Sequence, residues 1–154
     1  MYQRDFILRM IERFGQILIA LRNRILGGAD EEEVEAALQQ AGLQAGVDLN
    51  VVRSVSLDSL LMLVGSDGDI ELDRAWLMAE LLLLDGLHAA RIGEAGNADA
   101  SLTKARALYD LIGPSGAMLT GIPDLAERIA EVDRTLEALP SPAAHPELGE
   151  GRKA

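Results

Sequence analysis

One apolar segment near the middle of the chain, residues 72–92, constrains the fold more than any other feature. It includes a run of four leucines from Leu81 to Leu84. Consecutive residues of a helix point in different directions, so these leucines cannot all face one neighbour. We therefore predict a mostly buried helix from Leu72 to Ile92, covered on several sides like the central helix of a bundle.

The composition favours an all-helical core around this segment. The chain has 154 residues, the size of one domain, and 49% of them are hydrophobic but only 3% are aromatic. Such a core is built from Leu, Ile, Val, Met and Ala, which fill helix interfaces more naturally than pleated sheets. No segment has the clean period of two that a strand requires. The sequence thus predicts an all-α fold.

The first segment predicts a long amphipathic helix from Gln3 to Leu26, ended by Gly27 and Gly28. Its candidate interface residues are spaced alternately four and three apart and form one face: Ile7, Ile11, Phe14, Leu18, Leu21 and Ile25. We rank a core helix of the monomer first and a homodimer seam second. A membrane-surface helix comes third, because the polar face is only modestly cationic.

Start and stop signals divide the rest of the chain into further helices. Asp30 is a predicted N-cap, since the three glutamates after it complement the helix dipole. Ser56 is predicted to cap a short apolar helix that ends at Gly65. The residues Gly96 to Asp99 resemble a turn. With one turn of helix near Val51, the further helices are predicted at residues 30–44, 56–65, 98–112 and 123–139, for about five to six in all.

The same signals predict one domain and a tail. The helices fill residues 1–139, and the proline-rich composition after them predicts a flexible C-terminal tail over residues 140–154. The longest apolar run of the first helix, Ile17 to Leu21, is far too short for a secretion signal or a membrane span. We expect a cytoplasmic protein.

The charge distribution argues against a nucleic-acid or membrane partner. The net charge is −11, yet residues 1–28 carry five arginines and two acids, a net of +3, which leaves −14 for the remainder. A basic first helix could contact phosphates, as Arg9 and Arg13 would. We rank that function lowest, because these arginines can neutralise the acidic remainder of the same molecule.

No familiar catalytic motif is present. Without cysteine there are no disulfides, thiolate metal sites or cysteine nucleophiles. The two histidines, His88 and His145, form no metal-binding pair, and a lone helical histidine is more often packed or exposed than a ligand. Ser115 follows a helix and lacks the spacing of a nucleophile elbow. We assign no catalytic, cofactor-binding or metal-binding residues and expect no cofactor.

The acidic stretch "GSDGDIELDR", Gly65 to Arg74, has the composition of a calcium loop but not its spacing. When Gly68 takes the glycine position of an EF-hand loop, Leu63 and Arg74 fall on the first and twelfth positions, where ligands are required. We therefore predict a turn and an acidic helix start, with cation binding by residues 67–73 as an untested alternative.

Two acids, Glu80 and Asp85, lie among the leucines of the predicted central helix. An acid in apolar surroundings can have a raised pKa, which would suit catalysis. It is more often at a helix edge or paired with an arginine. We assign neither acid a catalytic role.

Small and apolar residues around the end of the central helix have the spacing of a tetratricopeptide (TPR) repeat. The TPR-like packing residues are Gly86, Gly93, Ala98, Leu102 and Ala105, spaced seven, five, four and three apart. Leu82 and Ala89 stand where such repeats usually have aromatic residues. The spacing also puts Gly96 and Asn97 inside an early helical turn, so we expect a longer loop there.

The chain as a whole resembles a bacterial family of TPR-like helical proteins with no assigned activity. The resemblance spans residues 2–148 and rests on stretches such as "YQRDFILRMIERFGQILIAL", "IELDRAWLMAELLLLDG" and "IPDLAERIAEVDRTLEALPSP". It implies a TPR-like antiparallel helical bundle and carries over no site. We expect a non-enzymatic scaffold or protein–protein interaction module, which binds a protein partner or itself. The alternative is a small acid- or metal-dependent hydrolase that uses acidic loop residues.

Overall fold

A computed structural model describes residues 2–64, 72–116 and 125–140 of the chain. The described residues contain helices and no strand, so the predicted all-α fold is confirmed. These ranges contain seven helices, one more than the upper estimate from the sequence: α1 (Tyr2–Leu26), α2 (Glu31–Gln44), α3 (Leu49–Ser54), α4 (Leu57–Val64), α5 (Leu72–Arg91), α6 (Ala95–Gly116) and α7 (Leu125–Ala138).

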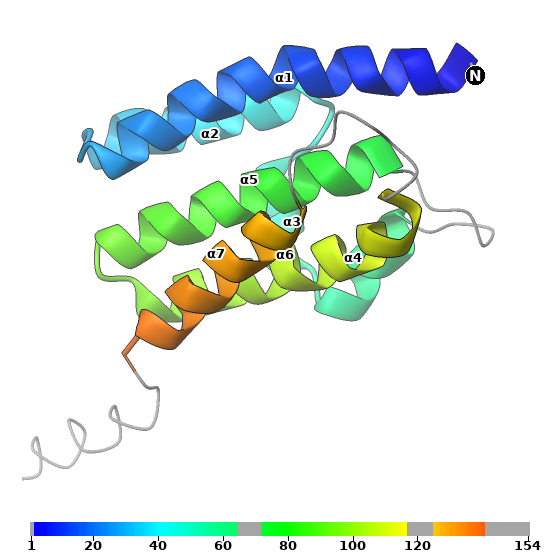
Figure 1. Cartoon of the computed structure of the whole chain (residues 1–154). Coiled ribbons are helices and arrows are strands. Elements are labelled where there is room, and N and C mark those ends of the chain that lie inside the picture. The colour runs from blue at the N-terminus through cyan, green and yellow to red at the C-terminus, as the bar shows by residue number, and fades with distance from the viewer. Residues whose placement is uncertain (1, 65–71, 117–124, 141–154) are drawn as a thin grey trace, which may run out of the picture.

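Helix α5 is the centre of the bundle, as its leucine run predicts. In Figure 1, α1 and α2 lie on one side of α5, and α6 and α7 lie on the other. Helix α4 also packs against it. Every residue from Ala75 to Ala89 is buried, which confirms a helix covered on several sides. No helix in the described ranges is long and apolar enough to cross a bilayer.

The predicted N-caps of α2 and α4 are confirmed. An Asp30 carboxylate oxygen accepts hydrogen bonds from the backbone N–H groups of Glu32 (3.1 Å) and Glu33 (3.3 Å) at the start of α2. Ser56 Oγ accepts one from the N–H of Ser59 (3.1 Å) at the start of α4. Gly28 ends α1 with a φ of +81°, a conformation that favours glycine.

The predicted boundaries of α6 are wrong at both ends. The helix begins at Ala95 instead of Ala98, because the chain turns earlier, at Gly93, whose φ is +84°. The N–H of Glu94 donates to the carbonyl of Ala89 (2.8 Å) and closes this turn. The predicted turn at Gly96 to Asp99 is therefore helical. At the other end, α6 continues past Ile112 to Gly116, so Gly113 and Pro114 belong to its last turn.

The candidate interface residues of α1 lie inside the bundle wherever their side chains are described. Phe14, Leu18, Leu21 and Ile25 are 2–8% exposed in the single chain. Ile7 and Ile11 belong to α1, but their side chains lie outside the described part. A core helix of the monomer accounts for the four buried residues. Self-association along α1 stays a prediction.

The TPR-like packing residues lie where α5 meets α6. A Cβ atom added to Gly86 would come within 2.5 Å of Leu102 Cγ, so only glycine allows this approach of the two helices. Ala98, Leu102 and Ala105 are fully buried. Gly93 forms the turn between the helices instead of a helix contact.

Two predicted segments cannot be compared with the structure. Most of the acidic stretch, residues 65–71, lies outside the described residues, and so does the predicted tail after Pro140. Pro123 and Asp124, the predicted start of the last helix, also lie outside, while the described part of that helix begins at Leu125.

Candidate functional site

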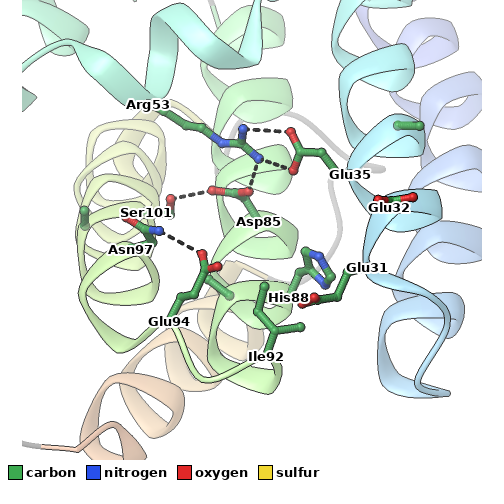
Figure 2. A pocket seen from close by; sticks show the side chains of 13 residues that line it. Glu31, Glu32, Glu35, Arg53, Asp85, His88, Ile92, Glu94, Asn97 and Ser101 are labelled. Atoms are coloured by element: carbon green, nitrogen blue, oxygen red, sulfur yellow. Dashed lines mark hydrogen bonds and ion pairs between the residues drawn. The ribbon is translucent and has the colours of Figure 1, made fainter.

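A groove of about 540 Å³ lies between α2 and α6, with α5 as its floor (Figure 2). Its size is typical of sites that bind small molecules or side chains of a partner. Four helices and the α5–α6 turn contribute its lining: Glu31, Glu32, Glu35, Ala36, Arg53, Asp85, His88, Ala89, Ile92, Glu94, Asn97, Ala100 and Ser101.

The groove is strongly acidic. It is lined by five carboxylates and one guanidinium, a formal net charge of −4 without His88. Ala36, Ala89, Ile92 and Ala100 supply apolar wall between the charged groups. Low-dielectric walls concentrate the field of the carboxylates, so the groove attracts cations and repels anions.

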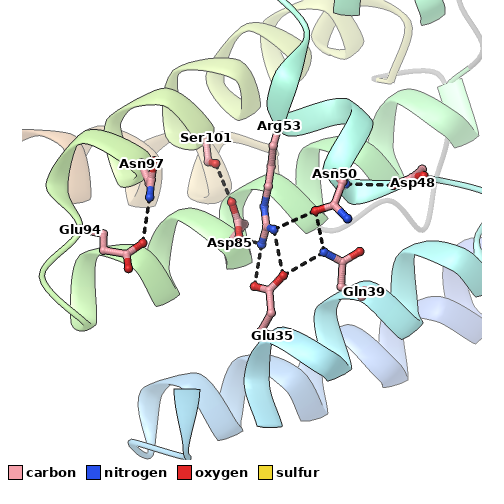
Figure 3. A network of polar contacts seen from close by, with 9 residues as sticks. All are labelled: Glu35, Gln39, Asp48, Asn50, Arg53, Asp85, Glu94, Asn97 and Ser101. Carbon is pink, nitrogen blue, oxygen red and sulfur yellow. Dashed lines mark hydrogen bonds and ion pairs between the residues drawn. The ribbon is translucent and has the colours of Figure 1, made fainter. Parts of the chain in front are cut away.

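Arg53 holds the floor of the groove together (Figure 3). Its guanidinium forms two parallel hydrogen bonds with the Glu35 carboxylate, of 2.8 and 2.9 Å. Its Nη2 also donates to Asp85 Oδ1 at 2.5 Å. One arginine on α3 thereby connects α2 to α5.

Asp85 is buried on the floor and fully engaged. It is 6% exposed, and its second oxygen accepts a hydrogen bond of 2.7 Å from Ser101 Oγ on α6. A buried carboxylate costs a large desolvation free energy unless it is paired and hydrogen-bonded. Asp85 meets both conditions, so its burial is explained by Arg53 and Ser101.

Polar side chains on α2 and α3 orient this ion pair (Figure 3). Gln39 Nε2 donates to Glu35 at 2.8 Å and to Asn50 Oδ1 at 3.0 Å. Asp48 caps α3 by accepting from the backbone N–H of Asn50 at 3.0 Å. The carboxylate of Glu35 is thus fixed from two sides.

The ion pair shifts the pKa values of both partners. The hydrogen bond from Arg53 lowers the pKa of Glu35 despite its partial burial, with smaller contributions from Gln39 and from the charge of His88. The hydrogen bond to Glu35, followed by that to Asp85, raises the pKa of Arg53 above its ordinary value. Both shifts favour the charged forms.

Lys104 ties α6 to the end of α3. Its Nζ donates to the carbonyls of Val52 (3.1 Å) and Arg53 (2.7 Å), in the last turn of α3. A cation there complements the helix dipole. Burial lowers the pKa of Lys104, while the charge of Asp85 opposes that shift. The lysine helps to set where Arg53 lies.

His88 is the buried polar residue of the groove that the network leaves out. It is 7% exposed, and its imidazole forms no hydrogen bond with any residue in the described ranges. It lines the groove together with Glu31 of α2 (Figure 2). A ring nitrogen is therefore available to a ligand.

Glu80, the other acid of α5, lies outside the groove in a cluster of its own. It is 3% exposed, accepts a hydrogen bond from the hydroxyl of Tyr109 on α6, and accepts another from Arg128 Nε on α7 at 3.0 Å. The adjoining cavity measures only about 40 Å³ and is lined also by Trp76. That volume holds a few water molecules at most.

The sequence singled out part of this site. From the sequence, Glu80 and Asp85 are acids among leucines, and a helix edge or pairing with an arginine is the ordinary explanation. In the structure each of the two acids is paired with an arginine. Arg53, Glu35 and Lys104 were not identified. Arg53 is the one charged residue of the short helix α3, which is a signal, but its partners lie 18 and 32 residues away.

The described residues contain no group of three His, Cys, Asp or Glu side chains placed to hold a metal ion. No protein-family model, curated protein or solved structure matches the chain. The resemblance to a TPR-like bacterial family thus stays a prediction.

Proposed function

We propose that this protein is a non-enzymatic helical interaction module, and that the groove between α2 and α6 receives a segment of a partner protein. The carrying observation is the groove itself: about 540 Å³ of lined space between two helices, held open by an ion-pair network on its floor. Grooves between helices are a common place for partner segments to dock.

The network suits a docking site because it makes the floor rigid. Arg53 joins α2, α3 and α5, and Ser101 joins α6 to the same carboxylate. A preorganised groove does not have to be ordered by its partner, and this saves part of the entropy cost of binding.

The hydrolase alternative has less support from the same geometry. Glu35 and Asp85 both accept from Arg53, so neither carboxylate is free to act as a general acid or base. The hydroxyl of Ser101 donates to the Asp85 carboxylate and not to a histidine, which is the usual base for a serine nucleophile. The acidic loop on which this alternative first rested lies outside the described residues.

Selection from a random peptide library tests the proposal. We expect peptides whose binding is weakened at least about tenfold by Ala100→Trp, since the indole fills the groove from its α6 wall. Thr103→Trp is the matched control, because Thr103 is exposed on the same helix but does not line the groove. The proposal fails when no selected peptide distinguishes the two variants.

A further inference from the structure

We infer that the groove recognises a lysine side chain of the partner segment, and that His88 and Glu31 receive its ammonium group. This inference rests on the proposed function and adds the chemistry of the partner. Three observations carry it: the charge of the groove, the unbonded imidazole, and the acceptors that the network leaves over.

The charge of the groove selects a cation. Arg53 neutralises only part of the negative charge on the floor, and Glu31 and Glu32 at the rim form no ion pair with any residue that the structure describes. Neighbouring Glu33, by contrast, pairs with Arg24 at 3.2 Å and points out of the lining. An acidic or phosphorylated segment would be repelled here.

The imidazole of His88 provides a second and independent indication of a ligand. Buried polar side chains normally have a hydrogen-bond partner, and one that lines a groove without such a partner within the protein is completed by solvent or ligand. His88 is more than nine-tenths buried, and the Glu31 carboxylate lines the same groove. The unprotonated nitrogen of a neutral imidazole accepts a hydrogen bond, as an ammonium donor requires, whereas the charged form that lowers the pKa of Glu35 has no acceptor.

The remaining acceptors fit an ammonium better than a guanidinium. A guanidinium prefers the fork of a carboxylate. On the floor of the groove the fork of Glu35 is already occupied by Arg53. The forks of Glu31 and Glu32, unpaired among the described residues, are free only at the exposed rim. One oxygen of Glu94 accepts from Asn97 at 2.8 Å. The deepest acceptor left over is the single ring nitrogen of His88. An ammonium is a compact charge that can donate to separate single acceptors, whereas a guanidinium would leave several of its five donors unpaired there.

Four synthetic peptides that differ only at the anchor residue test the inference by fluorescence anisotropy. The four peptides share one serine–glycine sequence, and their single anchor position carries lysine, arginine, norleucine or N-acetyl-lysine. At low salt we expect the lysine peptide to bind about tenfold more tightly than the acetylated and norleucine peptides, and more tightly than the arginine peptide. Added salt should weaken the lysine peptide most.

Variants of the chain locate the ammonium. His88→Phe keeps a ring but removes the acceptor, and should weaken the lysine peptide about tenfold, whereas His88→Gln retains an acceptor and should lose less. Glu31→Gln should weaken it as well. Glu137→Gln is the matched control, with the same change in net charge at an exposed position of α7 away from the groove.

The outcomes separate the two proposals. Suppose that Ala100→Trp abolishes binding, but the lysine and norleucine peptides bind equally well. That result overturns the ammonium assignment and leaves the proposed docking groove intact. A preference for arginine over lysine also overturns it. When no peptide of any charge responds to Ala100→Trp, the docking function fails and the inference fails with it. Far-ultraviolet circular dichroism of His88→Phe checks that a lost affinity is not lost fold.

Discussion

The two buried acids of α5 are both stabilised by pairing, but one lies in a closed cluster and the other lines a groove. Glu80 and Asp85 are 3% and 6% exposed, and each is paired with an arginine from another helix and with a hydroxyl group on α6. Around Glu80 the helices close and leave about 40 Å³. Around Asp85 they remain apart and leave a groove of about 540 Å³.

The difference teaches that a buried ion pair alone does not mark a functional site. Both pairs satisfy the carboxylate, and the Glu80 cluster has no room for a partner. What distinguishes the Asp85 cluster is open space beside unpaired groups, namely the carboxylates of Glu31 and Glu32 and the imidazole of His88. The small cavity at Glu80, by contrast, offers only the unbonded Nε1 of Trp76 among the described residues. The polar groups that the network does not use are the informative ones.

The largest expected effect on stability comes from replacing either of the two arginines that pair with the buried acids. Arg128→Met should lower the free energy of unfolding by about 3 kcal/mol, because among the described residues it leaves the buried Glu80 carboxylate with Tyr109 as its one partner. Arg53→Met should cost less, about 2 kcal/mol, because water in the groove can reach Asp85 and Glu35. Urea unfolding followed by circular dichroism measures both. A greater cost for Arg53→Met would mean that the groove cluster is the more closed of the two.

A smaller effect is expected from Gly86→Ala, next to Asp85. The added Cβ would lie 2.5 Å from Leu102 Cγ, so α5 and α6 must separate or Leu102 must shift, at a cost of about 1–2 kcal/mol. Gly15→Ala is the control, since a Cβ there meets nothing within 4 Å and should stabilise α1 by about 0.5–1 kcal/mol. Equal urea midpoints for the two variants would show that the close α5–α6 contact is not needed.

The smallest expected effects are on the pH dependence of stability, which should have opposite signs for the two clusters. Burial, with help from the charge of Glu80, raises the pKa of Tyr109 well above its ordinary 10.0. The folded state therefore holds this proton more tightly than the unfolded state, and its contribution to stability is complete below pH 10 and lost as pH rises toward the folded pKa. Arg53 lowers the pKa of Glu35 below its ordinary 4.5, so that contribution is present above pH 4.5 and lost as pH falls.

Urea midpoints measured across the pH scale test these opposite signs. Tyr109→Phe should flatten only the alkaline decline, and Glu35→Gln should flatten only the acid decline. The acid effect is the smaller, because the Glu35 side chain is 41% exposed and solvent screens its ion pair. An alkaline decline that survives in Tyr109→Phe would assign it to another group.

Much of the fold could be predicted from local patterns. The leucine run at Leu81 to Leu84 requires cover on all sides, and α5 has it. The caps at Asp30 and Ser56 depend on residues within three positions, and both are present. The start of α6 was predicted wrongly because Gly96 and Asn97 resemble a turn, while the actual turn at Gly93 depends on a backbone conformation that another glycine nearby could equally have adopted.

The sequence by itself determined the all-helical class, the buried central helix and the caps of α2 and α4, because spacing, caps and breakers act over a few residues. It also singled out Glu80 and Asp85 as acids at a helix edge or paired with an arginine. Only the tertiary structure decided which arginine each acid meets and that one cluster is closed while the other lines a groove. Those outcomes depend on contacts between side chains as far apart as 48 residues, and on how far the helices stand from one another. No local pattern encodes a distance of that kind.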